Sequence, residues 1–100
     1  MKLPLNYETF LNSLQKEAPS EYWPEALQAL WYDAKGGWNA SHNIAQDIPS
    51  DLGCWIHAYL HRKEGDSFNA GYWYRRAGRS YPNTTLEEEF QILVEFVLNS

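Results

Sequence analysis

Apolar residues recur every three or four positions through most of this chain, and this spacing constrains its fold more than any other feature. Such a period places the apolar side chains on one face of an α-helix, whereas a half-buried β-strand alternates apolar and polar residues. No segment alternates in that way over a useful length, and no Asn-Gly turn lies between β-branched runs. The sequence therefore predicts an all-α protein of about six helices, whose short loops place neighbouring helices antiparallel.

Capping residues, prolines and glycines set the ends of the predicted helices. Asn6 caps the first helix, which ends before Pro19 because the residue before a proline avoids the helical conformation. Thr85 and Glu88 form a capping box at the start of the last helix. The predicted helices cover residues 7–18, 24–35, 38–46, 51–64 and 67–77, and a last one from residue 85 past residue 97.

Composition restricts the classes of protein to which the chain can belong. With 100 residues, of which 44% are hydrophobic and 16% aromatic, we expect a single folded domain over residues 1–100 and exclude intrinsic disorder for most of it. The net charge of −5 argues against a general nucleic-acid binder, since such binding depends on neutralising phosphates. No apolar run is long enough for a membrane span, and no signal-peptide pattern follows the first methionine. The single cysteine, Cys54, is typical of a reducing compartment, so we expect a cytoplasmic protein.

Two helix–turn–helix units repeat within the chain. Trp38-Asn39-Ala40 aligns with Phe68-Asn69-Ala70 at a shift of 30 residues, and each triplet follows a helix that ends at glycine. The second unit resembles a tetratricopeptide or Sel1-like repeat, and the first unit matches that family only at its turn and at Ala40. The resemblance rests on the turn Gly65-Asp66, on Ala70, Tyr74 and Ala77, and on the terminal Pro82. The whole chain is also similar to short bacterial proteins of unknown role.

The family resemblance implies a fold and a function. The fold is a compact bundle of two TPR-like helical hairpins with capping helices at both ends. The function is a non-catalytic protein-interaction module, in which a groove between stacked helix pairs holds a peptide or a partner protein. His57 and His61 depart from the family, which usually has apolar or aromatic residues at these positions.

One stripe of the fourth predicted helix carries possible metal ligands. Cys54, His57, His61 and Glu64 follow one another at spacings of three and four residues, so they share one helix face. Thiolates and imidazoles bind zinc and other divalent transition metals, and His42 or Asp33 from the preceding unit could complete the set. Structural histidines, hydrogen-bonded to a carbonyl or an acid, explain the same pattern, as does contact with another ligand.

A second cluster is basic and aromatic. Five of the chain's eight Lys and Arg residues fall within residues 62–79, where tyrosines and a tryptophan are interleaved. Arginine recognises carboxylates and phosphates bidentately and stacks on aromatic rings, so this segment could bind an acidic peptide or a small anion. Alternatively, Arg75, Arg76 and Arg79 complement a helix dipole and pair with the acidic start of the last helix, residues 87–89.

These observations favour binding over catalysis. The sequence lacks a phosphate-binding loop, a nucleophile elbow and a zinc-protease motif, so no enzymatic activity and no cofactor are expected. Trp31, Trp55 and Trp73 are expected in the core, and Trp23 and Trp38 are expected to be partly exposed, which also allows a homodimer through exposed aromatics. We expect a protein or peptide partner, with no nucleic acid and no membrane. The expected binding residues are Trp38, His42, His57, His61, Arg62, Arg75 and Arg76; the alternative is a metal or small-anion site built on His57 and His61.

Overall fold

The structure of the protein is a computed structural model that describes residues 3–100. It contains six α-helices and one 3-10 turn, with no strand among the described residues, so the predicted all-α architecture is confirmed. The elements are α1 (Tyr7–Asn12), the 3-10 turn η1 (Ser13–Gln15), α2 (Glu25–Ala34), α3 (Trp38–Ala45), α4 (Asp51–Lys63), α5 (Ser67–Arg76) and α6 (Leu86–Leu98).

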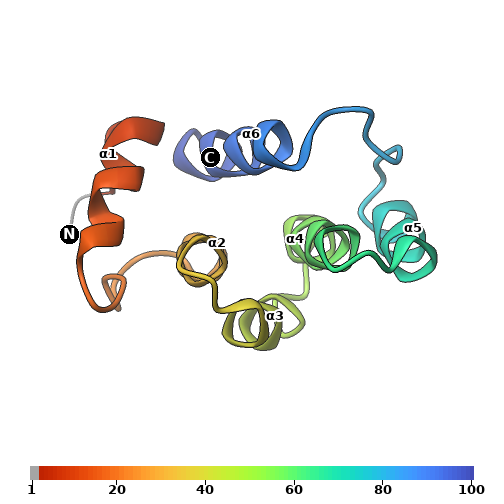
Figure 1. Ribbon diagram of the computed structural model, residues 1–100, viewed down its shortest axis with the longest axis horizontal. Helices are drawn as coiled ribbons and strands as arrows, with labels where there is room; N and C mark the ends of the chain where they lie inside the picture. The colour runs from red at the N-terminus through yellow and green to blue at the C-terminus, as the bar shows by residue number, and fades with distance from the viewer. Residues whose placement is uncertain (1–2) are drawn as a thin grey trace.

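Helices α2 to α5 follow one another side by side, and α6 lies across α2 and α4 (Figure 1). Helix α6 packs against α2 and α4, and its far end meets α1. The molecule measures 36 × 22 × 22 Å along its principal axes. None of the described helices combines the length and the apolar character that a membrane crossing requires.

The predicted helix ends are reproduced closely, except in the first helix. Asn6 caps α1 through its side chain, and the capping box of Thr85 and Glu88 is present. Helix α1 nevertheless stops at Asn12, instead of continuing to residue 18. The reason is that side chains of α2 bond to the next carbonyls along the chain: Trp31 Nε1 donates to Ser13 at 3.3 Å and Lys35 Nζ donates to Leu14 at 2.8 Å.

The two predicted hairpins are α2–α3 and α4–α5, and their turns have the same geometry. Gly36 and Gly65 have positive φ angles of 86° and 91°, a conformation that favours glycine at a helix C-terminus. In each turn the residue after the glycine donates its N–H to a carbonyl in the last turn of the preceding helix. Gly37 donates to Tyr32 at 2.8 Å, and Asp66 donates to His61 at 2.9 Å. The caps are therefore related by a shift of 29 residues, whereas the side-chain alignment gave 30.

This shift changes which small residue of α3 corresponds to Ala70. The equivalent position is Ser41, and both Ser41 and Ala70 are fully buried, whereas Ala40 is exposed. The alignment of Ala40 with Ala70 is therefore wrong by one residue, because the glycine caps set the register and the similar triplets do not. Burial along α2 and α4 also repeats at this shift of 29.

The core lies where α2, α4 and α6 meet. Trp31 and Trp55 are buried in it as expected, and Trp23 is buried as well, at 9% exposure, instead of being partly exposed. Trp23 packs beside Phe10, with ring centroids 6.3 Å apart. The largest fully buried side chains are Phe10, Leu27, Leu30, Trp31, Ile56, Leu60, Tyr74, Leu93 and Val94.

Candidate metal centre

All three histidines of the chain meet at the junction of α3 and α4. The Nε2 atoms of His42 and His57 are 3.0 Å apart, and one ring nitrogen from each of His42, His57 and His61 lies within 4.8 Å of the others. Since the sequence contains three histidines in total, the cluster uses every imidazole that the protein has.

The fold brings these rings together in two steps. His57 and His61 are four residues apart on α4, so they lie on one helix face, and their rings stack with centroids 4.9 Å apart. His42 lies on α3, which packs between α2 and α4 and turns this side chain toward the same face. Of the two residues that the sequence offered to complete the set, His42 and Asp33, the fold thus brings His42 to His57 and His61.

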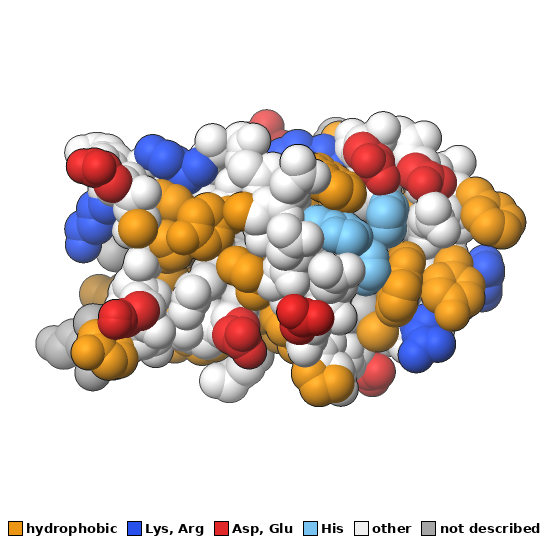
Figure 2. All heavy atoms as spheres, turned by 90° about the horizontal axis from the view of Figure 1, so that it is seen from below, with side chains coloured by type: hydrophobic (Ala, Val, Ile, Leu, Met, Phe, Trp, Pro, Cys, Tyr) orange, Lys and Arg blue, Asp and Glu red, His pale blue; other side chains and the backbone are white. Residues whose placement is uncertain are grey.

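Two tryptophans enclose the imidazoles. The Trp38 indole stacks on His42 at 4.8 Å between ring centroids, and the Trp73 indole stacks on His57 at 4.0 Å. Trp38 also donates its Nε1–H to the Leu60 carbonyl at 2.8 Å, which fixes the ring in place. Figure 2 shows the imidazoles grouped at the surface with hydrophobic side chains beside them.

Trp73 was expected in the core, but it is only partly buried and forms a wall of this cluster. The sequence did contain a signal for this position. Helices α4 and α5 run antiparallel about the turn at Gly65, and residues 57 and 73 are equally far from that glycine. Residues at matching distances from a hairpin turn lie at the same level along the two helices, which places Trp73 beside His57, and the two rings stack.

The environment keeps the buried imidazoles neutral. His57 is 7% exposed, and burial together with the neighbouring His42 and His61 lowers its pKa to about 4. Burial, and next the adjacent His61, also lowers the pKa of His42. Metal ions bind neutral imidazole, so a site that disfavours the protonated form favours a metal ion in competition with protons.

A carboxylate orients the third ring. Glu64 Oε2 lies 2.7 Å from Nδ1 of His61, so it fixes the proton on that nitrogen and leaves Nε2 available. Histidines that bind metals commonly donate their second N–H to a carboxylate in this way. Glu64 and Asp66 also form a second group with His61, although Asp66 caps α5 by accepting from Asn69.

The predicted ligand set is reproduced in part. His57 and His61 lie together and Glu64 contacts His61, but Cys54 joins neither of the two groups of candidate ligands among the described residues. Cys54 lies a full turn before His57 on α4. Asp33, the alternative to His42, is occupied elsewhere: it accepts from Tyr59 at 3.1 Å and from Lys63 at 3.0 Å.

The predicted arginines separate into two groups. Arg62 is not free for a ligand, because it donates to Glu89 at 2.7 Å and also to the Thr84 carbonyl. Arg75 and Arg76 are exposed in the last turn of α5, and within residues 3–100 neither forms an ion pair. The suggested pairing of Arg75, Arg76 and Arg79 with residues 87–89 is therefore wrong, since Arg62 takes the buried Glu89 instead.

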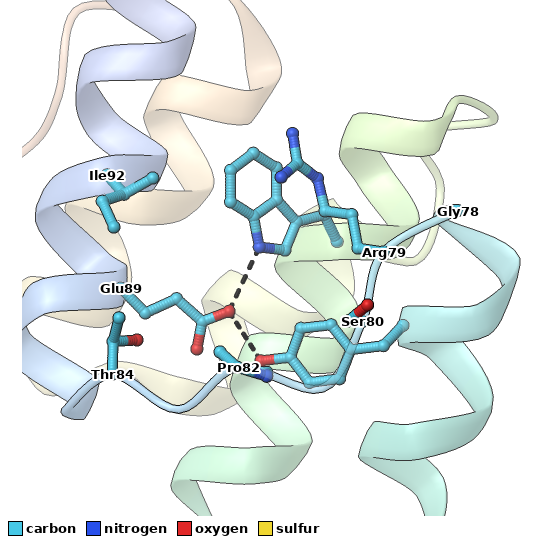
Figure 3. A pocket seen from close by; sticks show the side chains of 9 residues that line it. Gly78, Arg79, Ser80, Pro82, Thr84, Glu89 and Ile92 are labelled. Atoms are coloured by element: carbon cyan, nitrogen blue, oxygen red, sulfur yellow. Dashed lines mark hydrogen bonds between the residues drawn. The ribbon is translucent and has the colours of Figure 1, made fainter.

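Glu89 is the centre of a second polar cluster (Figure 3). It is 3% exposed, and its Oε2 accepts from Tyr74 at 2.6 Å and from Trp55 at 3.1 Å. The same residues line a pocket of about 390 Å³, at whose mouth the Arg79 guanidinium lies 3.3 Å above the Trp55 ring. Because Trp55 of α4 and Tyr74 of α5 both donate to Glu89 of α6, we interpret this cluster as a link between the three helices.

Comparisons with protein-family models, with curated proteins and with solved structures gave no match to this chain. The fold and the site together define it as a small all-α bundle with a three-histidine cluster at the junction of its two hairpins.

Proposed function

We propose that this protein binds a divalent first-row transition metal ion, with zinc as the test ion, through His42, His57 and His61. One observation carries the proposal: three imidazoles from two helices present ring nitrogens within 4.8 Å of one another. Imidazole ligands suit zinc, copper, nickel and iron, whereas calcium and magnesium prefer oxygen ligands.

The distances agree with such a site. Zinc binds histidine nitrogen at about 2.0–2.1 Å, so two ligands of a tetrahedral site lie about 3.3 Å apart. The Nε2 atoms of His42 and His57 are 3.0 Å apart, so they need to separate by only a few tenths of an ångström. A hydrogen bond between these two rings accounts for the metal-free state, and binding replaces it.

The repeat supplies well-matched variants for the test. Gln28 and Tyr32 of α2 occupy the positions that correspond to His57 and His61 of α4, at the shift of 29 residues. The double variant His57→Gln/His61→Tyr therefore carries side chains that the same fold already accepts at equivalent places. It should retain its circular dichroism spectrum and lose the metal ion.

Zinc binding to the tag-free protein is measured by isothermal titration calorimetry, with metal content measured after purification. We expect a stoichiometry near one, loss of binding in His42→Gln and in the double variant, and roughly 10- to 100-fold weaker binding in Glu64→Gln. Cys54→Ser should leave the affinity unchanged. Zinc binding that survives in the double variant, or no binding by the wild-type protein, would overturn the proposal.

The second candidate function is binding of an acidic peptide along α5, the interaction role implied by the repeat resemblance. It is supported by exposed aromatic side chains next to exposed arginines: Phe68 is 82% and Tyr72 42% exposed, and the guanidinium of Arg76 lies over the Tyr72 ring at 5.8 Å. Arginine and aromatic side chains together are frequent at the energetic centres of protein interfaces.

A fluorescent peptide of alternating glutamate and leucine tests this second function by anisotropy. Binding should be lost in Arg75→Glu/Arg76→Glu and be unchanged by a metal chelator. Lys16→Glu makes half of this charge change at an exposed site directly after η1, in a segment at the other end of the molecule from α5 (Figure 1), and it should leave binding unaffected. Equal loss in both variants would indicate a general charge effect and refute a site on α5.

A further inference from the structure

The three-histidine cluster offers fewer ligands than a closed structural zinc site requires. Structural sites almost always hold zinc with four protein ligands, whereas sites with three protein ligands keep one position for water or another small ligand. Among residues 3–100, no further histidine, cysteine, aspartate or glutamate joins the three imidazoles as a group of mutually close ligand atoms. Glu64 cannot supply the fourth ligand in this arrangement, since it bonds the opposite nitrogen of His61.

Charge and access indicate what takes the fourth position. Three neutral imidazoles leave the full positive charge of a divalent ion uncompensated, so an anionic oxygen is the favoured fourth ligand. The imidazoles are visible at the surface in Figure 2, so a small solute can reach them. The rim adds a second positive charge, because Arg76 lies 5.4 Å from the Trp73 ring, the same indole that stacks on His57.

We infer that the metal ion at this site keeps one exchangeable coordination position, which takes a carboxylate or phosphate oxygen attracted by the Arg76 guanidinium. This inference rests on the metal site proposed above and names the ligand class of that site. Trp38 and Trp73 form apolar walls beside the rings, so we expect the metal ion and the Arg76 charge to supply the attraction for the anion.

Cobalt is the probe for the test, because Co²⁺ binds to zinc sites and its visible absorption reports its ligands. The Co²⁺-loaded protein is titrated separately with inorganic phosphate and with acetate, and the visible spectrum is recorded. We expect a saturable spectral change with each anion, which shows that an outer ligand is exchanged.

Two variants with the same change in net charge test the role of the rim. Arg76→Gln should weaken phosphate binding by about threefold or more, since it removes the charge next to Trp73. Arg75→Gln removes an equally exposed charge that is not on that ring and should have a smaller effect. Equal effects of the two variants would refute the assignment to Arg76.

The outcomes separate this inference from the proposed function. If Co²⁺ binds but its spectrum does not respond to either anion, the coordination sphere is closed, and the inference fails while the metal site stands. An intense near-ultraviolet thiolate band that Cys54→Ser removes would likewise identify a fourth protein ligand and overturn it. If neither Co²⁺ nor Zn²⁺ binds, both proposals fall together.

Discussion

The most direct test of how the cluster is built is to replace His57 with a residue that does not titrate and to measure how the unfolding free energy changes with pH. The pKa of this buried imidazole is lowered from an ordinary value of 6.5 to about 4, first by burial and then by His42 and His61. The folded protein therefore takes up a proton at this ring less readily than the unfolded chain does. As the pH falls from about 6.5 to about 4, the unfolded state is stabilised by protonation and the folded state is not.

The size of the effect follows from this difference in pKa. A difference of about 2.5 in pKa corresponds to roughly 3 kcal/mol of unfolding free energy once the pH is well below both values. Most of this unfolding free energy, about 2 kcal/mol, is lost as the pH falls from about 7 to about 4.5. Replacing His57 with glutamine removes the titrating group and therefore this part of the acid destabilisation.

Urea denaturation followed by circular dichroism measures the prediction, with a chelator present so that metal binding does not contribute. The wild-type protein should lose about 2 kcal/mol more than His57→Gln between the two pH values. All carboxylates of the chain are present in both proteins, so their contribution cancels in the comparison. An equal loss in the two proteins would refute the idea that His57 is held neutral by burial and by its neighbours.

Three further predictions test the fold and the site. Gly53→Ala should destabilise the protein by several kcal/mol or prevent folding, because the added Cβ would overlap the Ile48 carbonyl oxygen and lie 2.7 Å from the Ile48 Cβ. Gly71→Ala on α5 should be neutral or stabilise by up to about 1 kcal/mol, because its added Cβ would meet only the end of the Arg75 side chain, at an ordinary contact distance of 3.5 Å; thermal melts compare the two variants. Glu89→Ala should lower the unfolding free energy by about 3–5 kcal/mol, because it leaves Arg62 without its partner in a buried ion pair. Glu87→Ala, at an exposed position, should lower it by less than about 0.5 kcal/mol, and urea denaturation measures both variants. Zinc at roughly 100 times its dissociation constant should raise the unfolding free energy by about 2.7 kcal/mol, and the absence of that increment would contradict a specific site.

The helices could be predicted from sequence because their signals are local. Asn6, the glycine caps and the box of Thr85 and Glu88 act within one turn of the helix that they begin or end, so neighbouring residues suffice to identify them. The end of α1 could not be predicted in this way, because Trp31 and Lys35 of α2 bond the Ser13 and Leu14 carbonyls, just beyond that end, from 18 and 21 residues away.

The site could be predicted only to the extent that it lies on one helix. His57 and His61 share a face of α4 at a spacing of four residues, so their proximity follows from helical geometry. The choice of His42 over Asp33 depends on how α3 packs, and the pairing of Arg62 with Glu89 joins residues 27 positions apart. Such contacts depend on the tertiary arrangement, which spacing along one chain does not determine.

The repeat explains why the protein has one such cluster and where it lies. In α2 the two positions carry the half-buried Gln28 and Tyr32, and in α4 they carry His57 and His61. The third imidazole comes from α3, a helix of the preceding hairpin that packs against α4. With two hairpins there is a single junction of this kind, so the departure of α4 from the repeat pattern places one group of three imidazoles there, with His42 contributed by the first hairpin.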